Sequence, residues 1–159
     1  MAVREILTDP HPILHEPCKA IDDFGQGLAQ LSQDLCDTLA DSGAIGLSAP
    51  QIGRTERLIA VHVPDDEREL CIYVNPEIIR RRGFAIIEES CLSVPGVEAS
   101  VMRAAQVLVR YQDLAGETRE EEVSGLHAVC VQHETDHLEG KLFVDRLSWW
   151  RRRRLRKAA

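Results

Sequence analysis

The stretch VCVQHETDHLEG, residues 129–140, holds an H-E-x-x-H pattern: His133 and His137 lie four positions apart, and Glu134 follows the first histidine. On an α-helix, residues four apart share one face one turn apart, so two imidazoles can bind one cation. The adjacent carboxylate falls beside this row and can exchange protons without binding the metal. The pattern therefore predicts a metal site on a helix.

Hydrophobic spacing around this pattern predicts a helix over residues 125–139. The positions i, i+3, i+4, i+7 and i+11 are occupied by Leu126, Val129, Cys130, His133 and His137. The apolar members mark the face that packs inward, so we expect both histidines to point into the protein. Two hydrogen-bonded core histidines are the alternative, but the spacing and the adjacent glutamate favour a metal site.

A catalytic zinc-type site needs a third protein ligand and an open position for water. The metzincin pattern would place that ligand at position 143, which is Phe143, and Glu139 is the last glutamate of the chain. The ligand must therefore come from upstream, where the candidates are His11, His15, Cys18, Cys36, His62, Cys71, Cys91 and, on another face of the same helix, His127. Cys91 is favoured because it ends the apolar run of IIEESCLSVPG, residues 86–96, although a lone cysteine is more often a small core residue.

The remaining chain alternates between helix and strand patterns. Leucines at positions 28, 31, 35 and 39 predict an amphipathic helix over residues 23–41, which Gly43 would end. Apolar or alternating runs predict strands at residues 57–63, 70–76, 84–90 and 105–113, and residues 118–123 form the return strand of a hairpin after the turn DLAGE. No repeat or linker divides the 159 residues, so we expect one domain over residues 1–159.

Composition argues against several classes of protein. No apolar run approaches the roughly 20 residues of a membrane span, and the N-terminus lacks the apolar segment of a signal peptide. The five scattered cysteines do not suggest a disulfide framework and favour a reducing, cytoplasmic location. The last nine residues carry six of the 19 basic groups, which leaves all 26 acidic groups on the rest of the chain. Such an acidic body is not that of a sequence-specific nucleic-acid binder.

Three separated segments resemble the motifs of the peptide deformylases. AIGLSAPQ (44–51) is similar to G-φ-G-φ-A-A-P-Q, ESCLS (89–93) to E-G-C-L-S, and QHETDHLEG (132–140) to Q-H-E-x-D-H-L-x-G. ILTDPHPIL (6–14) and GKLFVDRLS (140–148) also resemble the ends of that family. The resemblance implies an α+β fold in which antiparallel sheets surround a central helix that carries the metal ligands, with further helices near both termini.

The resemblance also implies a reaction and its residues. Cys91, His133 and His137 would bind one divalent metal, Fe(II) in the cell and Zn(II), Ni(II) or Co(II) in purified protein. The substrate would be the N-formylmethionine of a new polypeptide, which is hydrolysed to formate and a free amine. Glu134 would act as general base and acid, and the side chain of Gln51 and the backbone N–H of Leu92 would stabilise the formyl oxygen as it gains charge.

A substrate pocket is expected around these groups. Ile87, Leu126 and Val129 are candidates for the methionine side-chain pocket, although each would also suit the core. The backbone of Ala44, Ile45 and Gly46 could pair with the extended substrate as an added strand does. Glu89 and Ser90 border the cysteine, and Glu89 could pair with Arg103 to steady that loop.

Three positions depart from the family pattern: Ala44 and Ser90 replace glycine, and Ser48 replaces alanine. A side chain at 44 or 90 is costly if the backbone there needs a positive φ. None of the three removes a ligand or Gln51, so we still expect an active enzyme. A zinc peptidase and a catalytically silent ribosome-associated module are the rival functions.

The C-terminal segment LSWWRRRRLRKAA, 147–159, is a basic helix end from position 148 onward. In one interpretation, Trp149, Trp150 and Leu155 pack part of this helix onto the body while the arginines stay solvated. The cluster from Arg151 to Lys157 favours a polyanion, and because deformylase substrates emerge from the ribosome, ribosomal RNA is the expected contact. No membrane partner and a monomeric state are expected.

Overall fold

The computed structural model describes residues 2–64 and 66–158. The helices and strands follow one another in this order: η1 (Pro12–His15), α1 (Gln26–Ser42), β1 (Gly46–Ser48), η2 (Ala49–Ile52), β2 (Leu58–Val61), β3 (Cys71–Arg82), β4 (Ala85–Cys91), β5 (Val94–Arg103), β6 (Gln106–Gln112), β7 (Thr118–Ser124), α2 (Gly125–Leu138), η3 (Phe143–Arg146) and α3 (Trp149–Ala158). The elements labelled η are short 3-10 helices.

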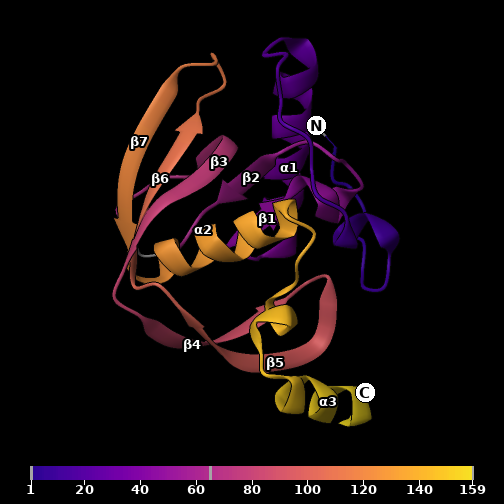
Figure 1. The fold of residues 1–159 in the computed structure, drawn as a ribbon. Coiled ribbons are helices and arrows are strands. Elements are labelled where there is room, and N and C mark those ends of the chain that lie inside the picture. The colour runs from indigo at the N-terminus through magenta and orange to yellow at the C-terminus, as the bar shows by residue number, and fades with distance from the viewer. Residues whose placement is uncertain (1, 65, 159) are drawn as a thin grey trace.

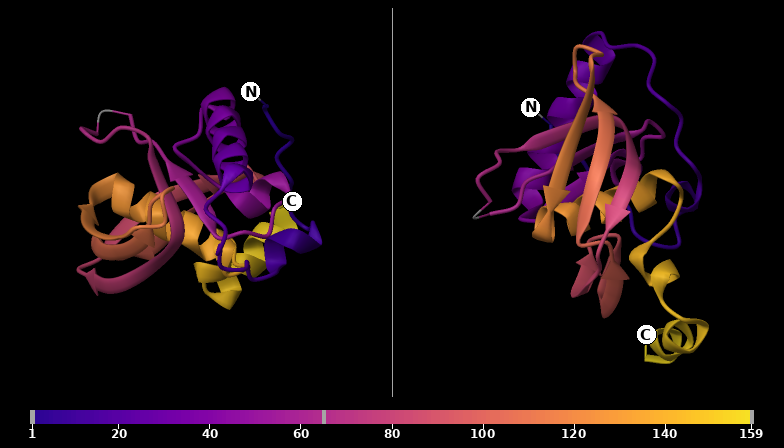
Figure 2. Two further views of the ribbon diagram at one scale, coloured as in Figure 1. Left: turned by 90° about the horizontal axis from the view of Figure 1, so that it is seen from above. Right: turned by 60° about the vertical axis from the view of Figure 1, so that its left-hand side comes forward.

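Two antiparallel sheets surround helix α2. The larger sheet has the strand order β1-β2-β3-β6-β7, and β4 and β5 form a separate two-stranded sheet. Figure 1 shows α2 crossing the centre of the molecule, with the large sheet above it, the β4–β5 hairpin below it and α1 at the top. The two views in Figure 2 show the same arrangement from above and from the side of β7. This is the α+β architecture that the sequence predicted, with α2 as the central helix.

Strand β2 explains how the two core layers are divided. Side chains on a strand alternate between its faces. Ile59 and Val61 belong to the apolar cluster that includes Ala128 and Val131 of α2. Leu58 and Ala60, on the other face, belong to a cluster with the leucines of α1 at positions 28, 31, 35 and 39. The part of the large sheet formed by β1 and β2 is therefore buried between α1 and α2.

Several element boundaries differ from the expected ones. Helix α1 starts at Gln26 and ends, as predicted, before Gly43, whose φ of 72° suits a glycine. Strand β3 continues past Pro76 to Arg82. Proline has no N–H for the hydrogen-bond ladder, and a register shift between Val74 and Glu77 accommodates it. Strand β5 was not predicted, since its first residues read as a turn.

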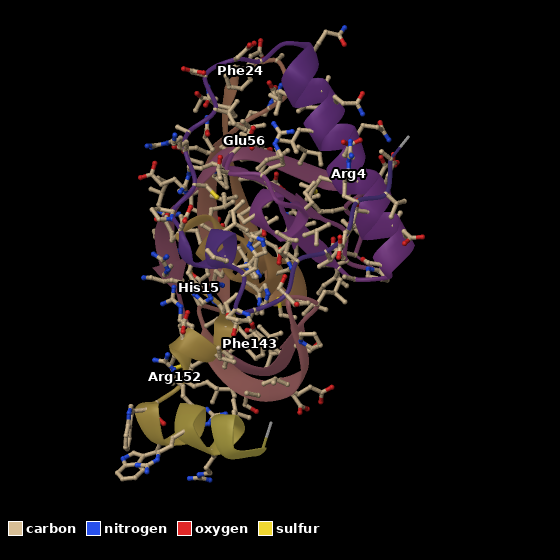
Figure 3. The ribbon with its side chains drawn as sticks, turned by 90° about the vertical axis from the view of Figure 1, so that its right-hand side faces the viewer. Arg4, His15, Phe24, Glu56, Phe143 and Arg152 are labelled. Carbon is tan, nitrogen blue, oxygen red and sulfur yellow. The ribbon has the colours of Figure 1, made fainter. Side chains whose placement is uncertain are left out.

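The expected packing of the C-terminal tryptophans was wrong. Trp149 and Trp150 are 58% and 67% exposed, and only Leu155 packs against the cluster that contains Phe143 and Leu147. Figure 3 shows α3 at the edge of the molecule, beyond the labelled Phe143. The two indoles pack against each other instead, with ring centroids 4.6 Å apart.

Within the described residues, no helix has the length and apolar character needed to span a membrane.

Candidate metal centre

Helix α2 carries the two histidines of the H-E-x-x-H pattern into the interior. It begins directly after β7, where the φ of 64° at Gly125 lets the chain turn sharply from strand into helix. His137 is 1% exposed, and the side chain of His133 is 11% exposed at the edge of a pocket. Their rings lie 5.1 Å apart between centroids, so both can reach a common point.

Cys91 joins the two histidines from the end of β4. A register shift between Ser90 and Cys91 and the tight turn into β5 bring its thiol to α2, where Sγ lies 3.4 Å from Nε2 of His137. Cys91, His133 and His137 each offer one donor atom, and these three atoms lie within 4.8 Å of one another. In the part of the chain that the structure describes, this is the one such group of three, so the other upstream cysteines and histidines do not complete a site.

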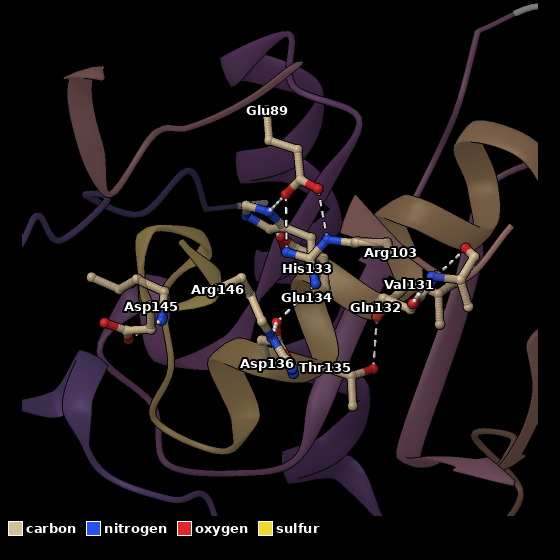
Figure 4. A network of polar contacts seen from close by, with 12 residues as sticks. Glu89, Arg103, Val131, Gln132, His133, Glu134, Thr135, Asp136, Asp145 and Arg146 are labelled. Carbon is tan, nitrogen blue, oxygen red and sulfur yellow. Dashed lines mark hydrogen bonds and ion pairs between the residues drawn. The ribbon is translucent and has the colours of Figure 1, made fainter. Parts of the chain in front are cut away.

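The ring of His133 is fixed by Glu89. Its Nδ1 lies 2.8 Å from Oε1 of Glu89, which leaves Nε2 facing the cluster. Glu89 is held in turn by Arg103, which donates from Nε at 2.6 Å and from Nη2 at 3.0 Å. Arg103 also donates to Asp136 at 2.9 Å, and Arg146 closes the network on the far side of Asp136 (Figure 4). The pairing of Glu89 with Arg103 that the sequence suggested is thus present.

These charges fit a bound cation. Burial lowers the pKa of His137 well below its usual value, so its ring is neutral and can donate a lone pair. At His133, hydrogen bonds to Cys91 and Glu89 outweigh burial and raise the pKa to about 10, which marks a place that attracts positive charge. Two imidazole nitrogens and one thiolate are a donor set for borderline divalent metals, and three protein ligands leave a position open.

Glu134 lies beside the ligands rather than among them. Its Oε1 is 3.6 Å from Nε2 of His133, and within the described residues its Oε2 is buried without a hydrogen-bond partner. Burial raises the pKa of this carboxyl to about 7. The position beside the ligand row is the one that the helix pattern predicted, and a carboxyl group so placed can take up and return a proton.

Gln51 reaches the cluster from the short helix η2. Its Oε1 accepts from the backbone N–H and from the hydroxyl of Ser48, both at 3.0 Å. Its Nε2 donates to Ser93 Oγ at 3.1 Å and lies 3.7 Å from Cys91 Sγ. The amide therefore presents its donor end to the metal ligands.

A pocket of about 580 Å³ opens over this group of side chains. Every residue that the sequence assigned to substrate binding lines it: Ala44, Ile45, Gly46, Ile87, Glu89, Ser90, Leu126 and Val129. Leu92 lines it as well, and Leu126 is 42% exposed at its wall rather than packed in the core. The geometry thus brings the predicted residues together around one cavity.

Ala44 and Ser90, which replace glycines of the family pattern, carry no backbone strain. Among the described residues other than glycine, only Asn75 has a positive φ, so neither Ala44 nor Ser90 needs the freedom of glycine. Gly46 is different, because a Cβ there would lie 2.5 Å from Cys130 Sγ. Close packing of β1 on α2 explains why this position is a glycine.

Some members of the site were not found in the sequence. Cys130 lines the pocket, Ser93 accepts from Gln51, and Asp136 holds Arg103. Cys130 was placed on the inward face of the helix, but a buried cysteine gives no signal of lining a pocket. The contacts of Ser93 and Asp136 join residues more than 30 positions apart in sequence, which no local pattern reveals.

Comparisons with known proteins agree with this geometry. The sequence model of the family described as "Polypeptide deformylase" matches residues 3–153. The chain is 40% identical to a peptide deformylase of Alkalilimnicola ehrlichii over 99% of this chain and 89% of the relative, and 43% identical to one of Hydrogenovibrio crunogenus over 94% and 89%.

Solved structures show the same similarity in three dimensions. A peptide deformylase from Legionella pneumophila superposes with a TM-score of 0.91 at 42% identity, over 98% of this chain and 92% of that one. An actinonin-bound class I type b peptide deformylase from Acinetobacter baumannii has a TM-score of 0.87 at 34% identity, over 93% and 100% of the two chains.

Proposed function

The chain belongs to the polypeptide deformylase family, and we propose that Cys91, His133 and His137 hold the metal with which it removes the formyl group from N-formylmethionine at the start of new polypeptides. The enzyme is a hydrolase that releases formate and a free amino terminus. The observation that carries the residue assignment is the cluster of these three donors, with Glu134 beside it, next to a pocket that Cys91, His133 and Glu134 line. When bound there, a divalent cation supplies water of lowered pKa and a polarised carbonyl.

Glu134 moves the proton in this proposal. Its carboxylate accepts a proton from the water that attacks the formyl carbon, and it returns a proton to the amine nitrogen as the C–N bond breaks. The position beside His133, outside the ligand group, supports this role. Its burial at 2% exposure keeps other water away from the proton.

Gln51 and Leu92 are proposed to stabilise the formyl oxygen as negative charge builds on it. Nε2 of Gln51 points toward the ligand cluster from one side of the pocket. Leu92 also lines the pocket, in the turn between β4 and β5 that follows Cys91. Two donors held in place before the reaction stabilise charge without the cost of reorienting water.

The pocket is proposed to bind the methionine side chain and the peptide backbone. Ile87 of β4 and Leu126 and Val129 of α2 supply apolar surface to this pocket. β1 is an edge strand of the large sheet, so the backbone groups of residues 44–46 that face away from β2 can pair with an extended substrate. The carbonyl of Ile45 faces β2, where it accepts from the backbone N–H of His62. Glu89 and Ser90 form the rim next to Cys91.

The metal, the location and the oligomeric state are proposed from the resemblance to the family. We propose Fe(II) as the metal in the cell, with Zn(II), Ni(II) or Co(II) in purified protein. Free thiols at Cys18, Cys36, Cys71, Cys91 and Cys130 support a reducing, cytoplasmic location. We also propose that residues 1–159 form one domain that acts as a monomer.

Helix α3 is proposed to contact ribosomal RNA. Arg151, Arg153 and Arg154 are exposed, as are both tryptophans, and the guanidinium of Arg153 lies 5.2 Å from the centroid of the Trp149 ring. Arg152 is instead paired with Asp145 at 3.3 Å, which ties the helix to the body. Exposed guanidinium groups beside aromatic faces suit phosphates and unpaired bases.

Formate release tests the assignment. Purified protein should release formate from formyl-Met peptides and lose activity on chelation. Glu134→Gln should reduce turnover at least 100-fold and leave the metal content unchanged, whereas Cys91→Ala should lower the metal content itself. Equal metal loss in both variants, or cleavage of unformylated peptides at a comparable rate, would contradict the proposal and favour a peptidase or a binding module.

A further inference from the structure

Ser48 lies behind Gln51, away from the pocket. It ends β1, is 0% exposed and does not line the cavity, so it cannot touch a substrate held there. Its side-chain hydroxyl donates to Oε1 of Gln51 at 3.0 Å, and the two residues form the capping box at the start of η2. The buried hydroxyl of Ser48 is thus directed at Gln51.

The amide of Gln51 is fixed at both ends. Oε1 accepts from the backbone N–H and from the hydroxyl of Ser48, and Nε2 donates to Ser93 Oγ at 3.1 Å. If the amide were reversed, its NH₂ group would face the Ser48 N–H, and two donors would meet in the interior. The backbone N–H therefore selects the orientation, and the hydroxyl adds a second donor to the same oxygen.

We propose that Ser48 is a positioning residue for Gln51, whose hydroxyl restrains the amide and strengthens the hydrogen bond that Nε2 gives to the reacting oxygen. Two donors on Oε1 draw electron density from the amide and make its N–H groups better donors in a low-dielectric site. With one donor removed, the amide rotates more freely, and part of its preorganisation is lost. This inference rests on the proposed role of Gln51.

The expected signature lies in the rate of the chemical step. Ser48→Ala should lower kcat by about fivefold, the rate equivalent of one ordinary hydrogen bond, and change KM less than twofold, because Ser48 makes no contact with the pocket. Metal content should not change. Ser48→Cys keeps a side chain of similar size with a weaker donor, so its kcat should lie between those of the wild type and Ser48→Ala.

A double-mutant cycle separates positioning from general stability. kcat, KM and metal content are measured with a short formyl-Met peptide for Ser48→Ala, Gln51→Ala and the double variant, and melting temperatures show that each is folded. Ser32→Ala is the matched control, since Ser32 is also a buried serine but lies on α1, and its kcat should equal that of the wild type. Positioning predicts that Ser48→Ala has almost no effect on kcat once Gln51 is absent.

The outcomes are distinct. A fivefold loss of kcat on Ser48→Ala in both backgrounds, or no loss in either, would overturn the positioning role while the role of Gln51 stands. Full activity of Gln51→Ala alone would overturn the proposed role of Gln51, and with it this inference. If Ser48→Ala does not fold, the same cycle is read with Ser48→Cys.

Discussion

His133 and Glu89 are joined through the ring nitrogen that faces away from the proposed metal ligands, with Nδ1 of His133 lying 2.8 Å from Oε1 of Glu89. The contact links β4 to α2, the two elements that supply all three proposed ligands. It fixes both the tautomer and the tilt of the imidazole, and the loss of such a partner typically lowers metal affinity about 10- to 100-fold. A carboxylate that never touches the metal is therefore part of the metal site.

Glu89→Gln should weaken metal binding by roughly 10- to 100-fold, because a neutral amide orients the imidazole less firmly and makes it a poorer ligand. Metal affinity is measured by competition with a chromophoric chelator. Glu98→Gln is the control, since Glu98 is an exposed residue on β5 outside the pocket. Unchanged affinity in Glu89→Gln would show that the contact with His133 is only structural.

Arg103→Gln should destabilise the fold through its buried ion pairs. The side chain is 3% exposed and neutralises both Glu89 and Asp136, so its removal leaves two buried carboxylates with fewer partners. We expect the free energy of unfolding in urea, measured on metal-free protein, to fall by about 3 kcal/mol.

The matched control for this variant is Arg110→Gln. Arg110 also pairs with a glutamate, Glu120, but both side chains are about half exposed. Its replacement should change the free energy of unfolding by less than about 0.5 kcal/mol. Similar losses in the two variants would show that burial does not decide the strength of these ion pairs.

Activity of the Fe(II) form should decay in air. The proposed ligand Cys91 lines an open pocket, so both its thiolate and the iron are accessible to oxidants. Protein loaded with Zn(II) or Ni(II) should lose activity more slowly. Mass spectrometry should find more oxidation at Cys91 than at Cys36, where burial raises the pKa of the thiol. Identical decay with every metal would point to unfolding.

Replacing Arg151, Arg153 and Arg154 with glutamine should weaken salt-sensitive co-sedimentation with ribosomes, because these guanidinium groups are exposed on α3. Turnover of a short formyl-Met peptide should stay within twofold of the wild type, since α3 lies outside the pocket. The control replaces Arg80, Arg81 and Arg82 of β3, which removes the same charge elsewhere. Equal sedimentation of the α3 variant and the wild type would remove the ribosome from the proposal.

Local patterns predicted much of the chemistry. The spacing of His133 and His137 placed them on one helix face with Glu134 beside them, because helix geometry depends only on positions a few residues apart. The alternation of Val107 and Val109 likewise placed β6 correctly, with both side chains buried. Cys91 could be favoured from its surroundings, but its place beside His137 depended on the fold.

Contacts between residues far apart in sequence were decided only by the tertiary structure. The clamp on Gln51 by Ser48 and Ser93, and the chain of contacts from His133 through Glu89 and Arg103, join β1, β4, β5 and α2. The exposure of Trp149 and Trp150 was decided in the same way, because α3 packs on the cluster of Phe143 and Leu147 through Leu155 and not through the indoles. A sequence period reports which face of an element is apolar, whereas the partner that covers that face is set by the packing of the whole chain.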